Sequence, residues 1–236
     1  MTVHNHHEHR PGSFGEEMAT SYDDNCRVMT PIYDNLHFLI RAVLDDLPKN
    51  ATILSVGAGT GTEIIRLAGF FPEFTFVAVD PSREMLAVCR ERLRAHGLLE
   101  RCTLVHGHIE DVSQEVTFDA ALCLLVLHHT PETVRQTIVK GIAGRLKPRG
   151  RFIVAELSYD DSTSQFGDLL DKWIAVLRIT GTAEKKARAL PALFKEHLSV
   201  LSPVAAENLL VANGFEQPVR FFQSLIMLAW FAQKRE

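Results

Sequence analysis

The feature that most constrains this chain is a glycine-rich turn between an apolar segment and a helical one. Residues 51–56 have the composition of a strand, and residues 61–70 have the pattern of a helix. Gly57, Gly59 and Gly61 stand at alternate positions between them. Glycine has no Cβ and tolerates positive φ, so such a turn lets a ligand approach the backbone closely. The unpaired N–H groups at the start of the helix can bind that ligand.

An acidic residue follows the second apolar segment. Residues 74–79 read as a strand, and Asp80 comes directly after it, nineteen residues past Gly61. A carboxylate at this place can accept hydrogen bonds from the hydroxyls of a ribose. The glycine turn and the acid together predict a cofactor that contains a nucleoside.

The glycine spacing separates the classes of nucleoside cofactor. The dinucleotide fingerprint is G-x-G-x-x-G, whereas this chain has G-x-G-x-G with Thr62 at the place of the last glycine. The Gly-Lys-Ser/Thr sequence of a P-loop is also missing. An NAD-dependent oxidoreductase is therefore the weakest alternative. A glycine triplet alone is equally compatible with an ordinary strand-to-helix turn.

Apolar runs alternate with helical patterns through the middle of the chain, which indicates an α/β fold with helices on both faces of a mostly parallel sheet. The expected strands are about 51–56, 74–79, 102–106, 118–124 and 150–157, and the expected helices about 61–70, 82–96 and 131–146. Ligands of such sheets bind at the carboxyl ends of the strands. Four candidate residues fall there: Gly57, Asp80, His108 and Leu124.

The remaining segments complete the expected organisation. We predict a flexible His-rich tail over 1–14 and one domain over 15–236. Within that domain we expect an N-terminal helical cap over 15–50, with a helical pattern broken at Pro31, and a cofactor-binding core over 51–157. Residues 158–236 are expected to form inserted helices and a closing hairpin. The added helices are expected at 164–179, 184–198 and 203–213.

The histidines of the tail raise the question of a metal site. His4, His6, His7 and His9 are irregularly spaced and have no partner cysteines. A mobile terminus is the favoured interpretation, and no metal is expected.

Composition limits the partners and the cellular compartment that are expected for this chain. Its 236 residues carry a net charge of −4, which argues against a broad phosphate-binding surface, so a nucleic-acid partner is not expected. Four scattered cysteines without a C-x-x-C motif predict free thiols in a reducing cytoplasm. The apolar run over 120–127 is too short to span a membrane, and no signal peptide is recognised.

Five segments carry a resemblance to the class I S-adenosylmethionine (SAM) dependent methyltransferases. Residues 53–63 resemble the first motif of that family, and residues 77–82 with Met85 resemble the second. The family's later motifs are matched by 104–111 on the adenine side, 118–129 at the fourth strand and 146–156 at the turn into the fifth. The resemblance implies SAM as cofactor and a seven-stranded Rossmann-like sheet. It says almost nothing about the methyl acceptor.

The resemblance also implies which residues bind the cofactor. They are Tyr33, Ser55, Gly57, Ala58, Gly59, Gly61, Asp80, Pro81, Met85, His108, Ile109 and Leu124. Ser55 departs from the pattern, because the family usually has an acid there that faces the cofactor's ammonium group. Glu63, in the first turn of the next helix, is a candidate replacement. His108 stands where an acid is common, which leaves Glu110 as another acceptor for the adenine amino group.

Catalytic candidates follow from the chemistry. Methyl transfer from a sulfonium needs mainly binding, orientation and exclusion of water, and it needs a base only when the acceptor must lose a proton. The candidates to act on an acceptor are His128, His129, Glu156 and Tyr159. If both histidines extended the fourth strand, they would point to opposite faces and at most one would reach the pocket.

A weaker, end-to-end resemblance points to the bacterial carboxy-SAM synthase branch, which is linked to tRNA modification. There a partner subunit's arginine holds the extra carboxylate, whereas Pro191 or a neighbouring residue aligns with that place here, and the nearest arginine, Arg188, is out of register. The leading hypothesis is a SAM-dependent methyltransferase with a small-molecule acceptor, which forms a homodimer through the helices after Glu156. A carboxy-SAM synthase-like enzyme and a SAM-binding protein without turnover are the alternatives.

Overall fold

The structure is a computed structural model that describes residues 29–236. The His-rich tail with its metal candidates, Cys26 and the first part of the expected helical cap lie outside the described residues.

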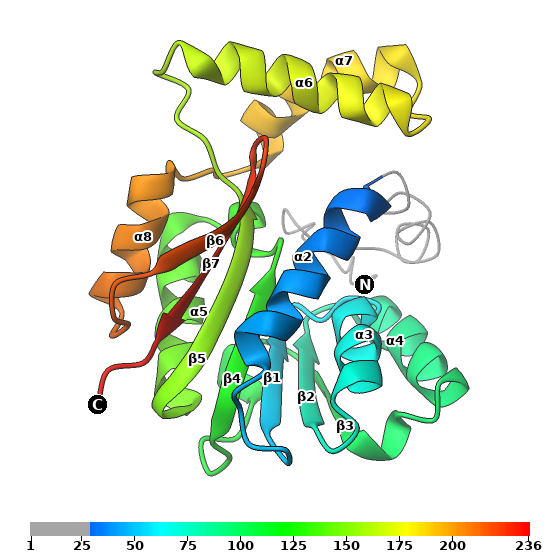
Figure 1. Ribbon diagram of the computed structural model, residues 1–236, viewed down its shortest axis with the longest axis vertical. Helices are drawn as coiled ribbons and strands as arrows, with labels where there is room; N and C mark the ends of the chain where they lie inside the picture. Colours follow the sequence, from blue (N-terminus) through cyan, green and yellow to red (C-terminus); the bar gives the residue numbers. More distant parts are fainter. Residues whose placement is uncertain (1–28) are drawn as a thin grey trace, which may run out of the picture.

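A seven-stranded sheet forms the centre of the molecule (Figure 1), in the order β3-β2-β1-β4-β5-β7-β6. The first five strands in the chain run parallel, whereas β7 pairs antiparallel with both β5 and β6. The predicted mostly parallel sheet is thereby confirmed. The strands are β1 (Thr52–Val56), β2 (Thr75–Asp80), β3 (Cys102–His106), β4 (Phe118–Leu124), β5 (Leu146–Leu157), β6 (Val219–Ser224) and β7 (Met227–Gln233).

Helices cover both faces of the sheet. One face packs against α2 (Thr30–Leu44), α3 (Thr62–Phe70) and α4 (Arg83–Ala95). The other packs against α5 (Glu132–Arg145) and α8 (Pro203–Ala212). Alternate residues of β4 enter the two cores, which explains why that strand is apolar without alternation.

Two further helices, α6 (Gln165–Ile179) and α7 (Glu184–His197), follow β5 and stand beyond the carboxyl ends of the strands at the top of Figure 1. Trp173 and Leu177 of α6 and Ala187 of α7 join the core cluster on the α2 side. Short 3-10 turns complete the described elements at η1 (Leu99–Arg101), η2 (Ile109–Asp111) and η3 (Leu127–His129).

The helical pattern was expected to break at Pro31, and α2 begins at Thr30 with Pro31 in its first turn, because proline at the first helical positions lacks an N–H that would have no partner there. The expected bounds of the fifth strand differ from the structure. β5 begins at Leu146 instead of residue 150, because Leu146 pairs with Phe118. The strand then passes a register shift, and Arg149, with φ of 59°, donates its N–H to the carbonyl of Lys234 at 3.1 Å.

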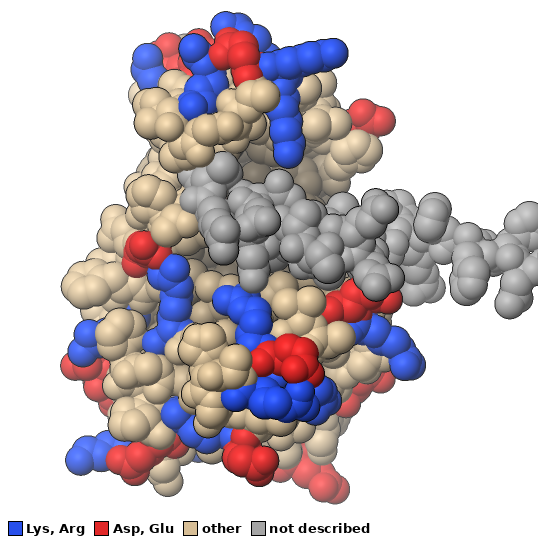
Figure 2. Space-filling view, turned by 90° about the vertical axis from the view of Figure 1, so that its right-hand side faces the viewer, with Lys and Arg blue, Asp and Glu red and all other residues tan. Residues whose placement is uncertain are grey.

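Charged side chains of both signs are interspersed over the body of the molecule on the face shown in Figure 2. None of the helices formed by residues 29–236 is long and apolar enough to cross a membrane.

The cysteines of the core generate the first prediction. Cys89, Cys102 and Cys123 are free and buried, and burial raises the pKa of Cys89 and of Cys102 to about 12. We expect a thiol reagent to modify at most one thiol in the folded protein at pH 8 and all four in denaturant, because buried neutral thiols are unreactive. Rapid modification of two or more thiols in the folded protein would contradict this packing.

Candidate functional site

Three glycines with positive φ build the turn after β1, and their surroundings differ. The φ angles of Gly57, Gly59 and Gly61 are 69°, 52° and 77°. A Cβ on Gly57 would lie 2.4 Å from Cγ2 of Val126, and one on Gly61 would lie 2.6 Å from Sγ of Cys89. A Cβ on Gly59 would meet nothing within 4 Å. The turn is therefore closed by packing at its two ends and open at its middle.

Asp80, at the carboxyl end of β2, faces this open middle. Its carboxylate accepts the backbone N–H of Gly59 at 2.9 Å and that of Ser82 at 2.8 Å. Burial raises the pKa of this carboxyl, and the two N–H donors oppose that effect by stabilising the charge. A carboxylate has about four acceptor positions, so Asp80 can accept further hydrogen bonds from a ligand.

Ser55 and Glu63, which flank the glycine turn in the sequence, are joined by a hydrogen bond. The hydroxyl of Ser55, near the end of β1, donates to Oε1 of Glu63 at 2.7 Å. Burial is the main reason why the pKa of Glu63 is raised to about 7. The second residue of α3 therefore brings a carboxyl group to the place where the end of β1 has only a hydroxyl.

The other residues expected to bind a cofactor fall into two groups. Pro81 and His108 are exposed beside the strand ends, and Leu124, Ala58 and Tyr33 lie at the end of β4, in the turn and on α2. The side chains of Met85 and Ile109 instead face the interior. Met85 is buried at the start of α4, and Ile109 packs against Gly141 of α5.

The segment after β4 contains features that the sequence did not reveal. Leu125 has a φ of 60°, which is strained for a residue with a branched side chain, and its N–H donates to the carbonyl of Ala155 at 2.6 Å. The next residue, Val126, occupies the space beside Gly57. No turn residue marks this position, so only the packed structure identifies it.

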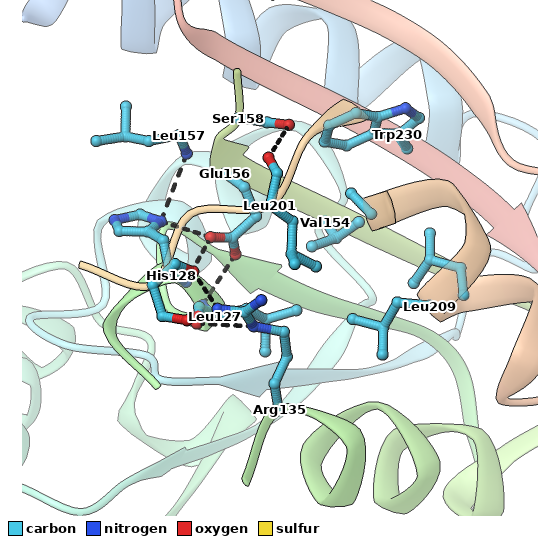
Figure 3. A pocket seen from close by; sticks show the side chains of 13 residues that line it. Leu127, His128, Arg135, Val154, Glu156, Leu157, Ser158, Leu201, Leu209 and Trp230 are labelled. Atoms are coloured by element: carbon cyan, nitrogen blue, oxygen red, sulfur yellow. Dashed lines mark hydrogen bonds and ion pairs between the residues drawn. The ribbon is translucent and has the colours of Figure 1, made fainter. Parts of the chain in front are cut away.

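Glu156 holds the turn that contains the paired histidines (Figure 3). Its carboxylate accepts the N–H groups of Leu127 at 2.9 Å and His128 at 2.8 Å, and it lies 2.5 Å from Nδ1 of His128. Both Glu156 and His128 are buried. The structure thus joins these two catalytic candidates in one internal network.

The histidines lie in the 3-10 turn η3 and not in an extended strand. The prediction that their side chains point to opposite faces assumed a strand, so it does not apply. The rings of His128 and His129 are neighbours, with centroids 4.4 Å apart. His129 is the more exposed of the two. Desolvation by the surrounding side chains, and after it the adjacent His128, lowers the pKa of His129 to about 4, so its imidazole is neutral at pH 7.

Tyr159, the fourth catalytic candidate, follows β5 and is partly buried. Its ring stacks on that of Phe166 at the start of α6, with centroids 4.5 Å apart. Burial raises the pKa of its hydroxyl, so Tyr159 is neutral at pH 7. This contact lies where the chain leaves the sheet for the added helices.

Arg135 of α5 links the histidine turn to the segment between α7 and α8. Its guanidinium donates to the carbonyls of Leu127 and Thr130, and to that of Ser199. The N–H of Ser199 in turn donates to the carbonyl of His128 at 2.8 Å. A small cavity beside Arg135 and Glu156, enclosed mainly by apolar side chains, separates them from Trp230 (Figure 3). The return from the added helices is therefore anchored at η3.

Metal ligands do not gather in the described part of the chain. Over residues 29–236, no group of three or more His, Cys, Asp or Glu side chains has an arrangement that could hold a metal ion.

Comparison with known proteins places this geometry in context. Residues 53–150 match a family described as a methyltransferase domain. A carboxy-S-adenosyl-L-methionine synthase of Methylococcus capsulatus is 31% identical over 156 residues, which are 64% of this chain and 63% of that protein. A ribosomal RNA small subunit methyltransferase G of Chlorobaculum tepidum is 34% identical over 86 residues, which are 36% of this chain and 39% of that protein.

A solved structure shares the fold. Human N-acetylserotonin methyltransferase in complex with SAM superposes with a TM-score of 0.59 at 18% identity, over 93% of this chain and 59% of that chain. The chain thus spans less than two thirds of the length of each of these three proteins.

The glycine turn generates a prediction about stability. We expect Gly61→Ala to lower the free energy of unfolding by more than Gly59→Ala does. Both substitutions place a Cβ at positive φ, which costs about 1–2 kcal/mol, but only alanine at position 61 also overlaps Cys89. Urea denaturation followed by circular dichroism measures the difference. Equal losses in the two variants would show that contact with Cys89 does not close the turn.

Proposed function

We propose that this chain, whose residues 53–150 match a methyltransferase domain, transfers a methyl group from SAM to a small-molecule acceptor. The observation that carries the proposal is the junction of the glycine turn with Asp80. Gly59 is bound to the Asp80 carboxylate at 2.9 Å, and its Cα faces open space. The two outer glycines of the turn are packed against other side chains, whereas the middle glycine leaves space beside the Asp80 carboxylate. This space is where we place the nucleoside of the cofactor.

The residues around that junction divide the binding of the cofactor. Asp80 accepts hydrogen bonds from the ribose hydroxyls. The backbone of Gly57, Ala58 and Gly59 lies along the methionine portion, and His108 lies beside the adenine. SAM supplies a methyl group on a sulfonium that is already an excellent leaving group, so the methyl passes to the acceptor and S-adenosylhomocysteine is released. The chain's task is to bind, orient and exclude water.

On the acceptor side, we assign the contact to His129 and Tyr159. His128 and Glu156 are engaged with each other and with the backbone of η3, which supports a positioning role for both. His129 follows directly and is the more exposed ring. Its lowered pKa keeps the imidazole neutral, so it can accept a proton or a hydrogen bond at neutral pH.

A small molecule is the acceptor class that the surface supports best. Basic and acidic side chains are interspersed over the body of the molecule on the face shown in Figure 2, and the net charge is −4. A nucleic-acid substrate is favoured by a continuous basic surface. The relative from Chlorobaculum tepidum is an RNA methyltransferase by name, so ribosomal RNA belongs among the acceptors to be assayed.

A carboxy-SAM synthase-like activity is the second candidate, favoured by the relative from Methylococcus capsulatus. Two residues of α7 argue against a carboxy-SAM synthase-like activity. Arg188 is exposed and paired with Glu184 at 2.5 Å, and Pro191 stands inside the helix at the aligned position. Tighter binding of carboxy-SAM than of SAM would favour this candidate over methyl transfer.

Asp80 provides the direct test of the main proposal. We expect Asp80→Ala to weaken binding of SAM and S-adenosylhomocysteine tenfold or more, about 1.4 kcal/mol, because the acceptor for the ribose hydroxyls is lost. Calorimetric titration measures the affinity, and circular dichroism checks that the variant is folded. An unchanged dissociation constant in a folded variant would contradict the proposed site.

We also propose that the protein works in the cytoplasm as a homodimer formed through α6 and α7. Free buried thiols support a reducing compartment. Apolar side chains on the helical pair support an interface, because Ile179 is 84% exposed and Leu193 is 40% exposed. We expect sedimentation equilibrium to give a dimer and Ile179→Asp to give a monomer. A monomeric wild-type protein at micromolar concentration would contradict the assembly.

A further inference from the structure

Arg135 of α5 is a buried cation with one end of its guanidinium unpaired. The residue is 2% exposed. Its Nε and Nη2 atoms donate to the carbonyls of Leu127, Thr130 and Ser199. Its Nη1 atom is buried, and no group of the described residues accepts a hydrogen bond from it. A buried donor without an acceptor is unfavourable, so this atom points to a partner that is not part of the described chain.

The charges near Arg135 do not pair with it directly. Burial lowers the pKa of Arg135, and the carboxylates of Glu156 and Glu132 oppose that effect from a distance. Glu156 is instead bound to the ring and the backbone of His128. None of the ion pairs found among residues 29–236 includes Arg135. A buried cation in these surroundings is stabilised by an anion that contacts it.

A groove between α5 and α8 leads to this side chain. Its volume is about 410 Å³, which lies within the range of about 300–1,000 Å³ that small-molecule sites occupy. Ala205, Leu209 and Ala212 give it an apolar wall, and Gln136 and Asn208 add neutral amides. The lining residues come from α5, α8 and the residues that adjoin α8. The groove is therefore separate from the junction of the glycine turn with Asp80.

The wall between this groove and the small cavity beside Glu156 lies next to the guanidinium. Leu201 and Leu209 line both spaces, as Arg135 does. Nε and Nη2 face the carbonyls of the histidine turn, so the planar guanidinium directs Nη1 away from that turn. Figure 3 shows Leu209 across the guanidinium from His128. Because Nη1 is buried, an anion in the groove reaches it when the side chain of Leu209 turns aside.

The first turn of α5 adds positive potential to the same groove. This helix has 14 residues, and Pro131 stands at its N-cap, where its side chain offers no acceptor to the first N–H groups. The N-terminal end of a helix carries partial positive charge and favours anions. Glu132 of the same turn is exposed and also lines the groove, so its charge acts against an anion there.

We propose that the groove between α5 and α8 binds a small organic carboxylate, with the carboxylate on Nη1 of Arg135 and the apolar part against α8. An inorganic anion would leave the apolar wall uncovered, and a neutral molecule would leave the cation unpaired. The site is additional to the proposed methyl transfer and does not rest on it. The other donors of Arg135 hold η3, so the bound carboxylate would contact the side chain that fixes the turn of His129.

Benzoate and benzamide are the probes, because they share a shape and differ in charge. We expect the full-length protein to bind benzoate at least fivefold more tightly than benzamide in calorimetric titrations, since a charge-assisted hydrogen bond is stronger than a neutral one. Arg135→Met should weaken benzoate binding to the level of benzamide, with circular dichroism confirming that the variant is folded. Arg90→Met, at an exposed arginine of α4, is the matched control and should leave both affinities within twofold.

Two further variants test the groove without removing the hydrogen bonds of Arg135. Glu132→Gln removes the opposing charge at the surface and should strengthen benzoate binding threefold or more, with benzamide affinity unchanged. Ala205→Phe fills the apolar part of the groove and should weaken binding of both probes tenfold or more. A gain from the first variant and a loss from the second would support the site even if Arg135→Met fails to fold.

Binding elsewhere on the protein gives a different pattern. Benzoate bound at the proposed acceptor site would lose affinity in His129→Ala and keep it in Ala205→Phe, and this result would overturn the inference. Equal affinities of the wild type for benzoate and benzamide, or no benzoate binding at millimolar concentration, would overturn it as well. None of these results affects the proposed SAM site, which Asp80→Ala tests separately.

Discussion

The hydrogen bonds that Asp80 accepts are the contacts on which the rest of the site depends. One joins the carboxylate to Gly59, in the turn after β1, and the other joins it to Ser82, which caps α4. A single side chain at the end of β2 thereby sets the relative positions of the glycine turn and the next helix. The open space beside Gly59 exists because the turn is held at this distance, with Val126 and Cys89 packed at its ends.

A second carboxylate organises the opposite side of the sheet's carboxyl edge. Glu156 receives two backbone N–H groups and the His128 ring, and Arg135 ties the same turn to the segment after α7. The helices added after β5 are thus anchored at both ends beside His129. The segment that follows α7 therefore contacts the turn that carries the ring we assign to the acceptor.

The sequence predicted most of the elements because apolar periodicity and turn chemistry are local signals. Strands β3 and β4 have the expected bounds, and the other elements of the core, β5 excepted, begin and end within about one residue of expectation. The start of β5 was missed because its pairing with β4 and with the last strand is set by distant partners, Phe118 and Lys234. The strained φ of Leu125 was missed for a similar reason, since nothing in its neighbours along the chain requires it.

The sequence by itself determined the α/β class, the glycine turn and the acid that faces it, because each follows from residue types at fixed spacing along one segment. Only the tertiary structure decided which candidates meet. It paired Ser55 with Glu63, placed His128 and Glu156 in one buried network, and turned Met85 and Ile109 toward the interior. These outcomes depend on contacts between segments far apart in the chain, and the packing of strands and helices fixes such contacts in three dimensions.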